Sequence, residues 1–180
     1  SPPANFSNNL ALADTESSTN GAEVSFTNFA TDVLSGVASY WISTNMAPFI
    51  QADNTTLTNE LAHTVRSFVI DGAGNRTSTN SNMIIVDFTA PIYESNNLAL
   101  ADGDVYTNNA SVSYTNFGSD ALSGVASFWI STNMAAFIQA DNTTLTNELA
   151  HTVRSFVIDG AGNRTSTNSN MIIVDFTAPS

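Results

Sequence analysis

The chain of 180 residues contains an internal repeat, because its sequence matches itself when it is shifted by 88 residues. The block 32–88 aligns with 120–176 without a gap. Only three pairs of residues differ within it: Val33/Ala121, Tyr40/Phe128 and Pro48/Ala136. A period of this length exceeds the about 20–50 residues of solenoid repeats and suits an independent domain. We therefore expect two copies of one domain, residues 1–88 and 89–180.

The junction between the copies is short. It reads Asp87-Phe88-Thr89-Ala90-Pro91, and the second copy ends on the same five-residue motif. It contains a proline and no Gly/Ser run, so it predicts a stiff joint around residues 87–91 rather than a loose tether. Near-identical neighbours build length or valency, whereas a bipartite catalytic site usually needs two different halves.

Strand signals dominate each copy. β-Branched, aromatic and small polar residues prevail, and no long 3.6-residue apolar period appears. The first copy has strand-like runs at 9–13, 22–28, 37–43, 49–52, 55–57, 62–70 and 81–88. Two glycines in 71–75 predict a tight turn, and 58–61 fits a single helical turn. Short strands at this spacing indicate an all-β, antiparallel β-sandwich in each copy.

Three segments occur in the same order in both copies. In the first copy they are DVLSGVAS at 32–39, HTVRSFVIDGAGN at 63–75 and DFTAP at 87–91. Together they resemble the bacterial immunoglobulin-like repeat family. The resemblance implies two tandem immunoglobulin-like sandwiches that serve as stalk or adhesion modules of large bacterial surface proteins, often ordered by calcium.

One departure from the family pattern is the histidine at positions 63 and 151. The family usually has there a tyrosine whose hydroxyl anchors a corner of the sandwich. In this chain the imidazole of His63 or His151 would have to supply that hydrogen bond, or the bond would be absent.

The composition disfavours several classes of function. The chain has 16 acidic and 4 basic residues, all of them arginine, with a net charge of −12. Nucleic acids and anionic membranes bind clusters of Lys and Arg, so we expect neither as a partner. No apolar run approaches the about 18–20 residues of a membrane helix, so we expect no membrane insertion. Cysteine is absent, which removes disulfides, thiolate nucleophiles and zinc–thiolate sites.

Catalysis finds little support in the residues. Each copy has one histidine and no G-x-S-x-G elbow. Strand alternation places His63, Val65, Ser67 and Val69 on one face, which favours a packed, hydrogen-bonded histidine at the edge of the core. We therefore expect that the protein is not an enzyme, although carboxylate pairs for acid–base chemistry stay open.

Calcium is the cofactor that the acidic residues suggest. In a seven-strand sandwich, the second–third and sixth–seventh loops lie at the pole where the chain enters. In the second copy these loops carry Asp120, Asp159 and Asn163, and the incoming linker carries Asp87. Calcium prefers six to eight oxygen ligands, so convergence of these groups predicts an interdomain calcium site. The alternative is that Asp71 and Asp159 only cap their own turns.

Aromatic residues offer a second kind of site. With His63 facing inward, Arg66 and Phe68 face outward, and either Tyr40 or Trp41 faces the core. We expect Trp41 to be the buried tryptophan of the third strand. The alternative is an exposed patch that binds a carbohydrate or a protein. Its residues would be Trp41, Arg66 and Phe68, with Trp129, Arg154 and Phe156 in the second copy.

The sequence thus predicts a structural spacer or stalk repeat of a secreted or cell-surface bacterial protein, an adhesin. Its partners would be neighbouring identical repeats of a longer chain, while other domains contact a host or surface receptor. Bound calcium would set the stiffness of the joint. The alternative function is a carbohydrate- or protein-binding module that uses the aromatic patch.

Overall fold

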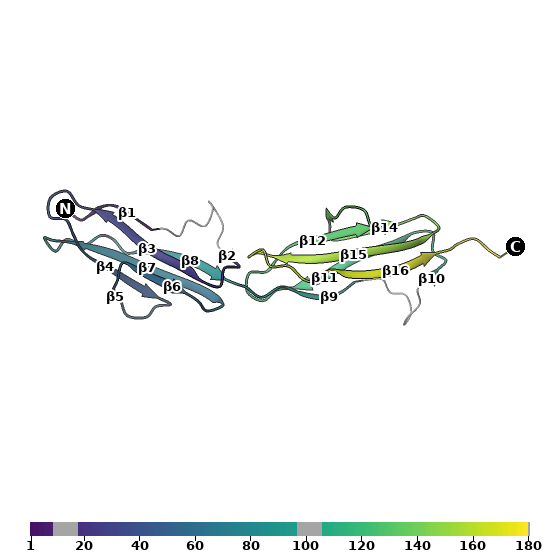
Figure 1. Ribbon diagram of the computed structural model, residues 1–180, viewed down its shortest axis with the longest axis horizontal. Helices are drawn as coiled ribbons and strands as arrows, with labels where there is room; N and C mark the ends of the chain where they lie inside the picture. The colour runs from purple at the N-terminus through teal and green to yellow at the C-terminus, as the bar shows by residue number, and fades with distance from the viewer. Residues whose placement is uncertain (9–17, 97–105, 180) are drawn as a thin grey trace. The chain divides into compact units, whose positions relative to one another are not determined.

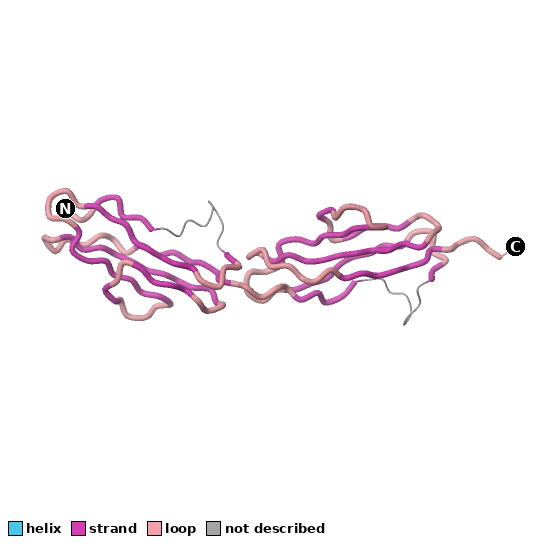
Figure 2. The backbone as a smooth tube through the Cα atoms, viewed as in Figure 1, coloured by secondary structure: helices cyan, strands magenta, loops and turns pink. Residues whose placement is uncertain are grey.

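The computed structural model describes residues 1–8, 18–96 and 106–179. All regular secondary structure within these ranges consists of β-strands (Figure 2). The chain divides into two compact units, Ser1–Phe88 (unit 1) and Thr89–Ser180 (unit 2). A search of the described residues finds no helix of the length and hydropathy that a membrane crossing requires.

Unit 1 is a sandwich of two sheets (Figure 1). Its described strands are β1 (Ala4–Asn8), β2 (Ser18–Thr19), β3 (Val24–Thr31), β4 (Val37–Thr44), β5 (Ile50–Gln51), β6 (Asn54–Leu57), β7 (Leu61–Asp71) and β8 (Asn80–Val86). One sheet has the order β1-β3-β6 and the other β2-β8-β7-β4-β5. Their neighbouring strands are antiparallel except β2 and β8, which run parallel.

Unit 2 repeats this arrangement. Its described strands are β9 (Ile92–Asn96), β10 (Tyr106–Thr107), β11 (Val112–Ser119), β12 (Val125–Thr132), β13 (Ile138–Gln139), β14 (Asn142–Leu145), β15 (Ala150–Asp159) and β16 (Asn168–Val174). The sheets have the orders β14-β11-β9 and β10-β16-β15-β12-β13. The predicted fold class, two immunoglobulin-like antiparallel sandwiches, is confirmed.

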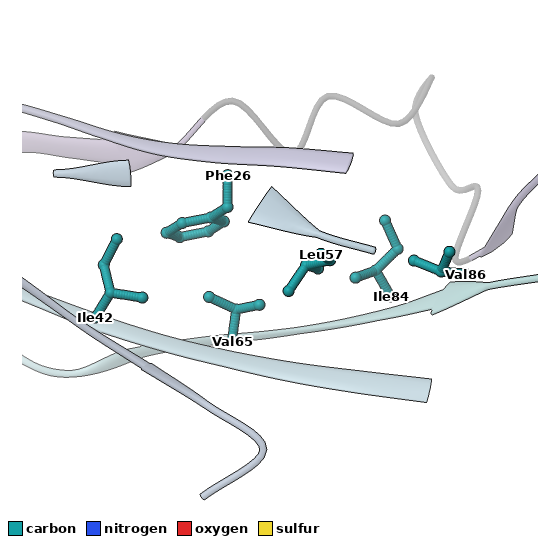
Figure 3. Packing of buried hydrophobic residues seen from close by; sticks show 6 residues of the cluster. All are labelled: Phe26, Ile42, Leu57, Val65, Ile84 and Val86. Carbon is teal, nitrogen blue, oxygen red and sulfur yellow. The ribbon is translucent and has the colours of Figure 1, made fainter. Parts of the chain in front are cut away.

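The core of unit 1 lies between its two sheets. Figure 3 shows side chains of both sheets pointing toward one another: Phe26, Ile42, Leu57, Val65, Ile84 and Val86, all buried. Strand β7 sends every second side chain into this layer, beginning with His63. Burial of one such large apolar side chain stabilises the fold by about 1.5–3 kcal/mol, so this layer is the main source of stability.

Two local expectations have different outcomes. The strand expected at 9–13 lies outside the described residues, and β1 ends just before it at Asn8. The helical turn expected at 58–61 is wrong, because residues 59–60 form a bend and β7 begins at Leu61. Tertiary hydrogen bonds hold this bend in place of helical ones: Glu60 accepts the N–H of Phe88 at 3.1 Å.

His63 of β7 forms a hydrogen-bonded corner with the bend at residues 59–60. The Nε2 atom of His63 lies 2.8 Å from the carbonyl oxygen of Asn59, which only accepts, so Nε2 carries the proton. Its Nδ1 atom lies 3.2 Å from Nδ2 of Asn45, whose Oδ1 accepts the N–H of Thr64. His63 therefore supplies the corner hydrogen bond. His151 makes the equivalent bond to Asn147 at 2.8 Å.

One core position differs between the units. Unit 2 has Tyr114, whose hydroxyl lies 2.7 Å from Oγ of Ser155, and both residues are fully buried. Unit 1 has Phe26 in its place, and the Oγ of the buried Ser67 has no hydrogen-bond partner among the described residues. Unit 1 thus contains an unsatisfied buried hydroxyl that unit 2 satisfies.

We expect Phe26→Tyr to stabilise unit 1 by about 1 kcal/mol, because the new hydroxyl reaches Ser67 as Tyr114 reaches Ser155. The reciprocal change, Tyr114→Phe, should destabilise unit 2 by a similar amount. Calorimetric unfolding of the whole chain measures both. Phe29→Tyr makes the same chemical change on the same strand at a side chain that is 52% exposed, so it should leave stability unchanged. A Phe26→Tyr variant no more stable than its parent would contradict the pairing.

Candidate functional site

The loop between β3 and β4 wraps around the carboxylate of Asp32. Its Oδ1 atom accepts the backbone N–H groups of Leu34 (3.1 Å), Ser35 (2.6 Å) and Gly36 (3.0 Å). The hydrogen bond from the Ser35 backbone is the largest cause that lowers the pKa of Asp32 below its ordinary value. The loop therefore holds an ionised carboxylate at one end of unit 1.

The turn after β7 holds a second carboxylate in the same manner. Asp71 accepts the N–H groups of Ala73 (3.0 Å) and Asn75 (2.7 Å), and its Oδ2 accepts the side-chain amide of Asn75 at 2.8 Å. These bonds lower the pKa of Asp71, and the Asn75 amide contributes most. Glycine at position 74 takes a φ of 85°, which the turn needs.

These two loops pack directly on each other. The N–H of Gly72 donates to the carbonyl of Gly36 at 3.0 Å. A Cβ atom at position 72 would overlap the carbonyl oxygen of Ser35, which explains the glycine there. The close contact brings Asp32 and Asp71 to one end of the sandwich, where the charge of Asp71 opposes the ionisation of Asp32.

Unit 2 places Asp120 and Asp159 in the equivalent loops. Asp120 accepts the N–H groups of Leu122, Ser123 and Gly124 at 2.8–3.1 Å through Oδ1. Asp159 accepts two backbone N–H groups through Oδ1, and the amide of Asn163 at 2.9 Å through Oδ2. Both predicted calcium ligands thus cap their own turns. Within the described residues, Oδ2 of Asp120 accepts no hydrogen bond, so ligand capacity remains.

The linker arrives beside this end of unit 2. The first residue of β9, Ile92, pairs with Ser119, the residue before Asp120. Asp87 precedes β9 by a few residues, and its N–H donates to the carbonyl of Thr19 at 2.9 Å within unit 1. Asp120, Asp159 and Asn163 offer carboxylate and amide oxygens at this end of unit 2, and calcium prefers oxygen ligands of these kinds.

The predicted aromatic residues lie on the outer face of the five-stranded sheet. Trp41 pairs with Phe68, while its neighbour Ile42 pairs with the inward-facing Ser67. The expectation that Trp41 is the core tryptophan is therefore wrong. The pairing shifts register between Val37 and Ser39, and the buried Ile42 occupies the core position instead. The Trp41 ring stays half-buried, and its Nε1 donates to Oγ of Ser39 at 3.0 Å.

Five side chains form a stack on this face, called the outer aromatic stack below. The rings of Trp41 and Phe68 are parallel, with centroids 5.9 Å apart. Phe49 meets Phe68 edge-on at 4.8 Å. The guanidinium of Arg76 lies 3.7 Å from the Phe68 centroid, and that of Arg66 lies 5.0 Å from the Phe49 centroid.

Unit 2 builds the same stack, with ring and guanidinium distances within 0.1 Å of those in unit 1. Its members are Trp129, Phe137, Arg154, Phe156 and Arg164. Sequence reasoning missed Phe49 and Arg76, since both lie just outside strands. The available signal for Arg76 is its position directly after the glycine turn, where the chain forms an isolated bridge with Ile70.

The histidines do not combine with a nucleophile in the described part of the chain. Both ring nitrogens of His63 and of His151 are engaged by asparagine groups at their corners. A Ser-His-Asp triad is therefore not formed around either ring.

Comparisons with known proteins add the following. No protein-family model matches the chain, and no curated protein sequence matches it significantly. Among solved structures it is similar to fibronectin(III)-like modules of Clostridium thermocellum CbhA, at 11% identity and a TM-score of 0.49, with 94% of each chain covered. It is also similar to the FN1–FN3 domains of chicken CNTN1, at 10% identity and a TM-score of 0.39, with 96% of this chain and 67% of that chain covered. The D00–D0 domain of intimin matches at 12% identity and a TM-score of 0.40, with 94% of this chain and 98% of that chain covered.

The lowered pKa of Asp71 predicts a specific dependence of stability on pH. The carboxylate is held ionised in the folded state, so its contribution is present above the unfolded-state pKa of about 3.9. That contribution is lost as the pH falls through the lower pKa of the folded state. Asp71→Asn should therefore destabilise the chain at pH 7, and the difference should shrink below about pH 4.

Urea unfolding at a series of pH values measures this difference. Glu23→Gln removes an exposed carboxylate outside the two turns and serves as the control. A destabilisation by Asp71→Asn that stays constant from pH 7 to pH 3 would mean that charge has no part in the turn.

Proposed function

We propose that the chain is a spacer: a pair of stalk repeats that extends a longer protein. The observation that carries the proposal is the tandem of near-identical sandwiches joined through residues 87–91. Strand β8 ends at Val86 and β9 begins at Ile92, so only this short segment, with Pro91, separates regular structure in the two units. Such a segment has little freedom to act as a loose tether.

The ordered motifs favour a setting in a bacterial surface protein. The segments at 32–39, 63–75 and 87–91 resemble bacterial immunoglobulin-like repeats, and we propose a secreted or cell-surface adhesin as the parent. The partners would then be neighbouring repeats of the same chain, and other domains would contact the receptor. The spacer itself is non-catalytic in this proposal, because the polar groups described above are used to hold corners and turns.

Calcium is the proposed lock of the joint. The ion would take carboxylate oxygens of Asp87, Asp120 and Asp159, with Asn163 as a further oxygen donor. Support comes from unit 2, whose two capped carboxylates lie in packed loops beside the arriving linker. Their like charges repel one another, and a divalent cation would remove that repulsion.

The test is a thermal unfolding experiment on the whole chain in millimolar CaCl₂ and in excess EGTA. An ion that binds only the folded state at 100 times its Kd stabilises it by about 2.7 kcal/mol, which raises the Tm. Small-angle scattering under both conditions should show a narrower distance distribution with calcium. Equal Tm values and equal scattering curves would remove calcium from the proposal.

Asp87→Asn should abolish both effects of calcium. The matched control is Asp175→Asn, since Asp175 is the equivalent residue of unit 2 and lies at the end of β16 that pairs with the start of β15, away from Asp159. A spacer locked by Asp87 loses its calcium response only in the first variant. Loss of the response in both variants would point to a general effect of net charge.

A further inference from the structure

All four cationic side chains of the protein lie in the two outer aromatic stacks. Arg66 donates through Nη2 to Oγ of Ser43 at 2.8 Å, and Arg76 donates through Nη2 to Oγ1 of Thr79 at 2.8 Å. Within the described ranges, none of the four arginines forms an ion pair with a carboxylate. In a chain with 16 acidic residues, this separation of the charges is unexpected.

The sheet beneath the stack keeps acids away from it. Only one carboxylate, Asp71, lies in the strands of this sheet in unit 1 (β2, β4, β5, β7 and β8). It faces inward and accepts hydrogen bonds from its own turn. The equivalent strands of unit 2 contain only Asp159, in the same role. The described strands of this sheet therefore present positive charge on their outer face without a carboxylate of their own on that face, although the protein as a whole is acidic.

The stack is accessible and pre-organised. Phe68 is only 8% exposed and forms its floor, whereas Trp41 is half-buried and Arg76 is exposed. The Arg76 guanidinium is fixed between the Phe68 ring and Thr79, so little side-chain freedom remains to be lost on binding. Its planar fork can pair with a carboxylate through two parallel hydrogen bonds.

We propose that the outer aromatic stack of each unit binds an acidic saccharide. One face of a sugar ring packs on the exposed part of Trp41, and the carboxylate of the sugar pairs with Arg76. Trp129 and Arg164 do the same in unit 2. This activity goes beyond the spacer role and does not depend on calcium.

Two observations favour a saccharide over an acidic peptide. The stack combines a flat aromatic surface with a guanidinium, and a sugar acid offers a rigid ring and a carboxylate together, whereas a Glu or Asp side chain offers only the carboxylate. The stack also occurs once in each unit with the same geometry. A polymer with a repeated anionic sugar would gain avidity from two such sites on one chain.

The experiment uses the whole chain in EGTA and isothermal titration calorimetry, with tryptophan fluorescence as a second readout. The probes are an oligogalacturonate, the same oligomer fully methyl-esterified, and an oligomer of sialic acid. We expect at least one acidic oligomer to bind and to shift the emission of tryptophan. Esterification keeps the sugar rings and removes the charge, so it should weaken binding of oligogalacturonate about tenfold or more.

The paired variants are Arg76→Gln with Arg164→Gln, and their binding should be about tenfold weaker or worse, with an unchanged Tm. Arg76→Lys with Arg164→Lys keeps the charge and should recover only part of the affinity. Ser111→Glu is the control for net charge, because it lowers the charge by one, half the change in the Gln pair, at an exposed position where unit 1 has Glu23. Its affinity should equal that of the parent protein.

Three results would overturn the proposal. Neither acidic oligomer binds; the esterified oligomer binds as tightly as the acid; or poly-glutamate binds as tightly as the saccharides, which would make the stack a general site for acidic protein segments. If the Gln variants lower the Tm, the Lys variants and the esterified probe still decide the question. Because EGTA is present throughout, failure here leaves the calcium lock untouched, and the reverse also holds.

Discussion

The strict alternation of β7 is the constraint on which both the interior and the surface of each unit depend. Its inward positions supply the corner histidine, the centre of the core and the capped carboxylate of Asp71. Its outward positions supply Arg66 and Phe68, on which the stack is built. A slip of one residue against β4 would exchange the two sets, burying a guanidinium and exposing Val65. The register is thus strongly specified, and core and surface cannot vary independently.

This dependence explains how far sequence reasoning could reach. The spacing of the short strands was sufficient to predict the sandwich, and the period of two in β7 was sufficient to predict the inward His63 and the outward Arg66 and Phe68. It was not sufficient for β4, where both alternating sets contain one large aromatic residue. The choice there is made by a register shift near Val37, which depends on pairing with another strand and has no period of its own. Phe49 and Arg76 join the stack from outside regular strands, so no spacing rule could place them.

A carboxylate that caps a turn can still offer an oxygen atom to a cation. Backbone N–H groups occupy Oδ1 of Asp120 and keep the side chain in a fixed orientation. In unit 1, hydrogen bonds within the turn after β7 lower the pKa of Asp71. An ion that binds there would therefore meet a carboxylate whose orientation is already fixed. The hydrogen bonds that explain these aspartates as turn caps would also orient their carboxylates for a metal ion.

The end of each sandwich and the face of its five-stranded sheet carry opposite charges for a common reason. With only two arginines in each unit, the local field depends on where the few cations are held. Phe49 and Phe68 hold them by cation–π contacts, which attract a guanidinium without neutralising it, whereas a carboxylate would cancel the charge. The aromatic rings are thus a means of keeping positive charge available on an acidic protein. If each stack binds a saccharide as proposed, a weak site would be adequate because it recurs, since the two sites lie on one chain and the second binding event becomes intramolecular.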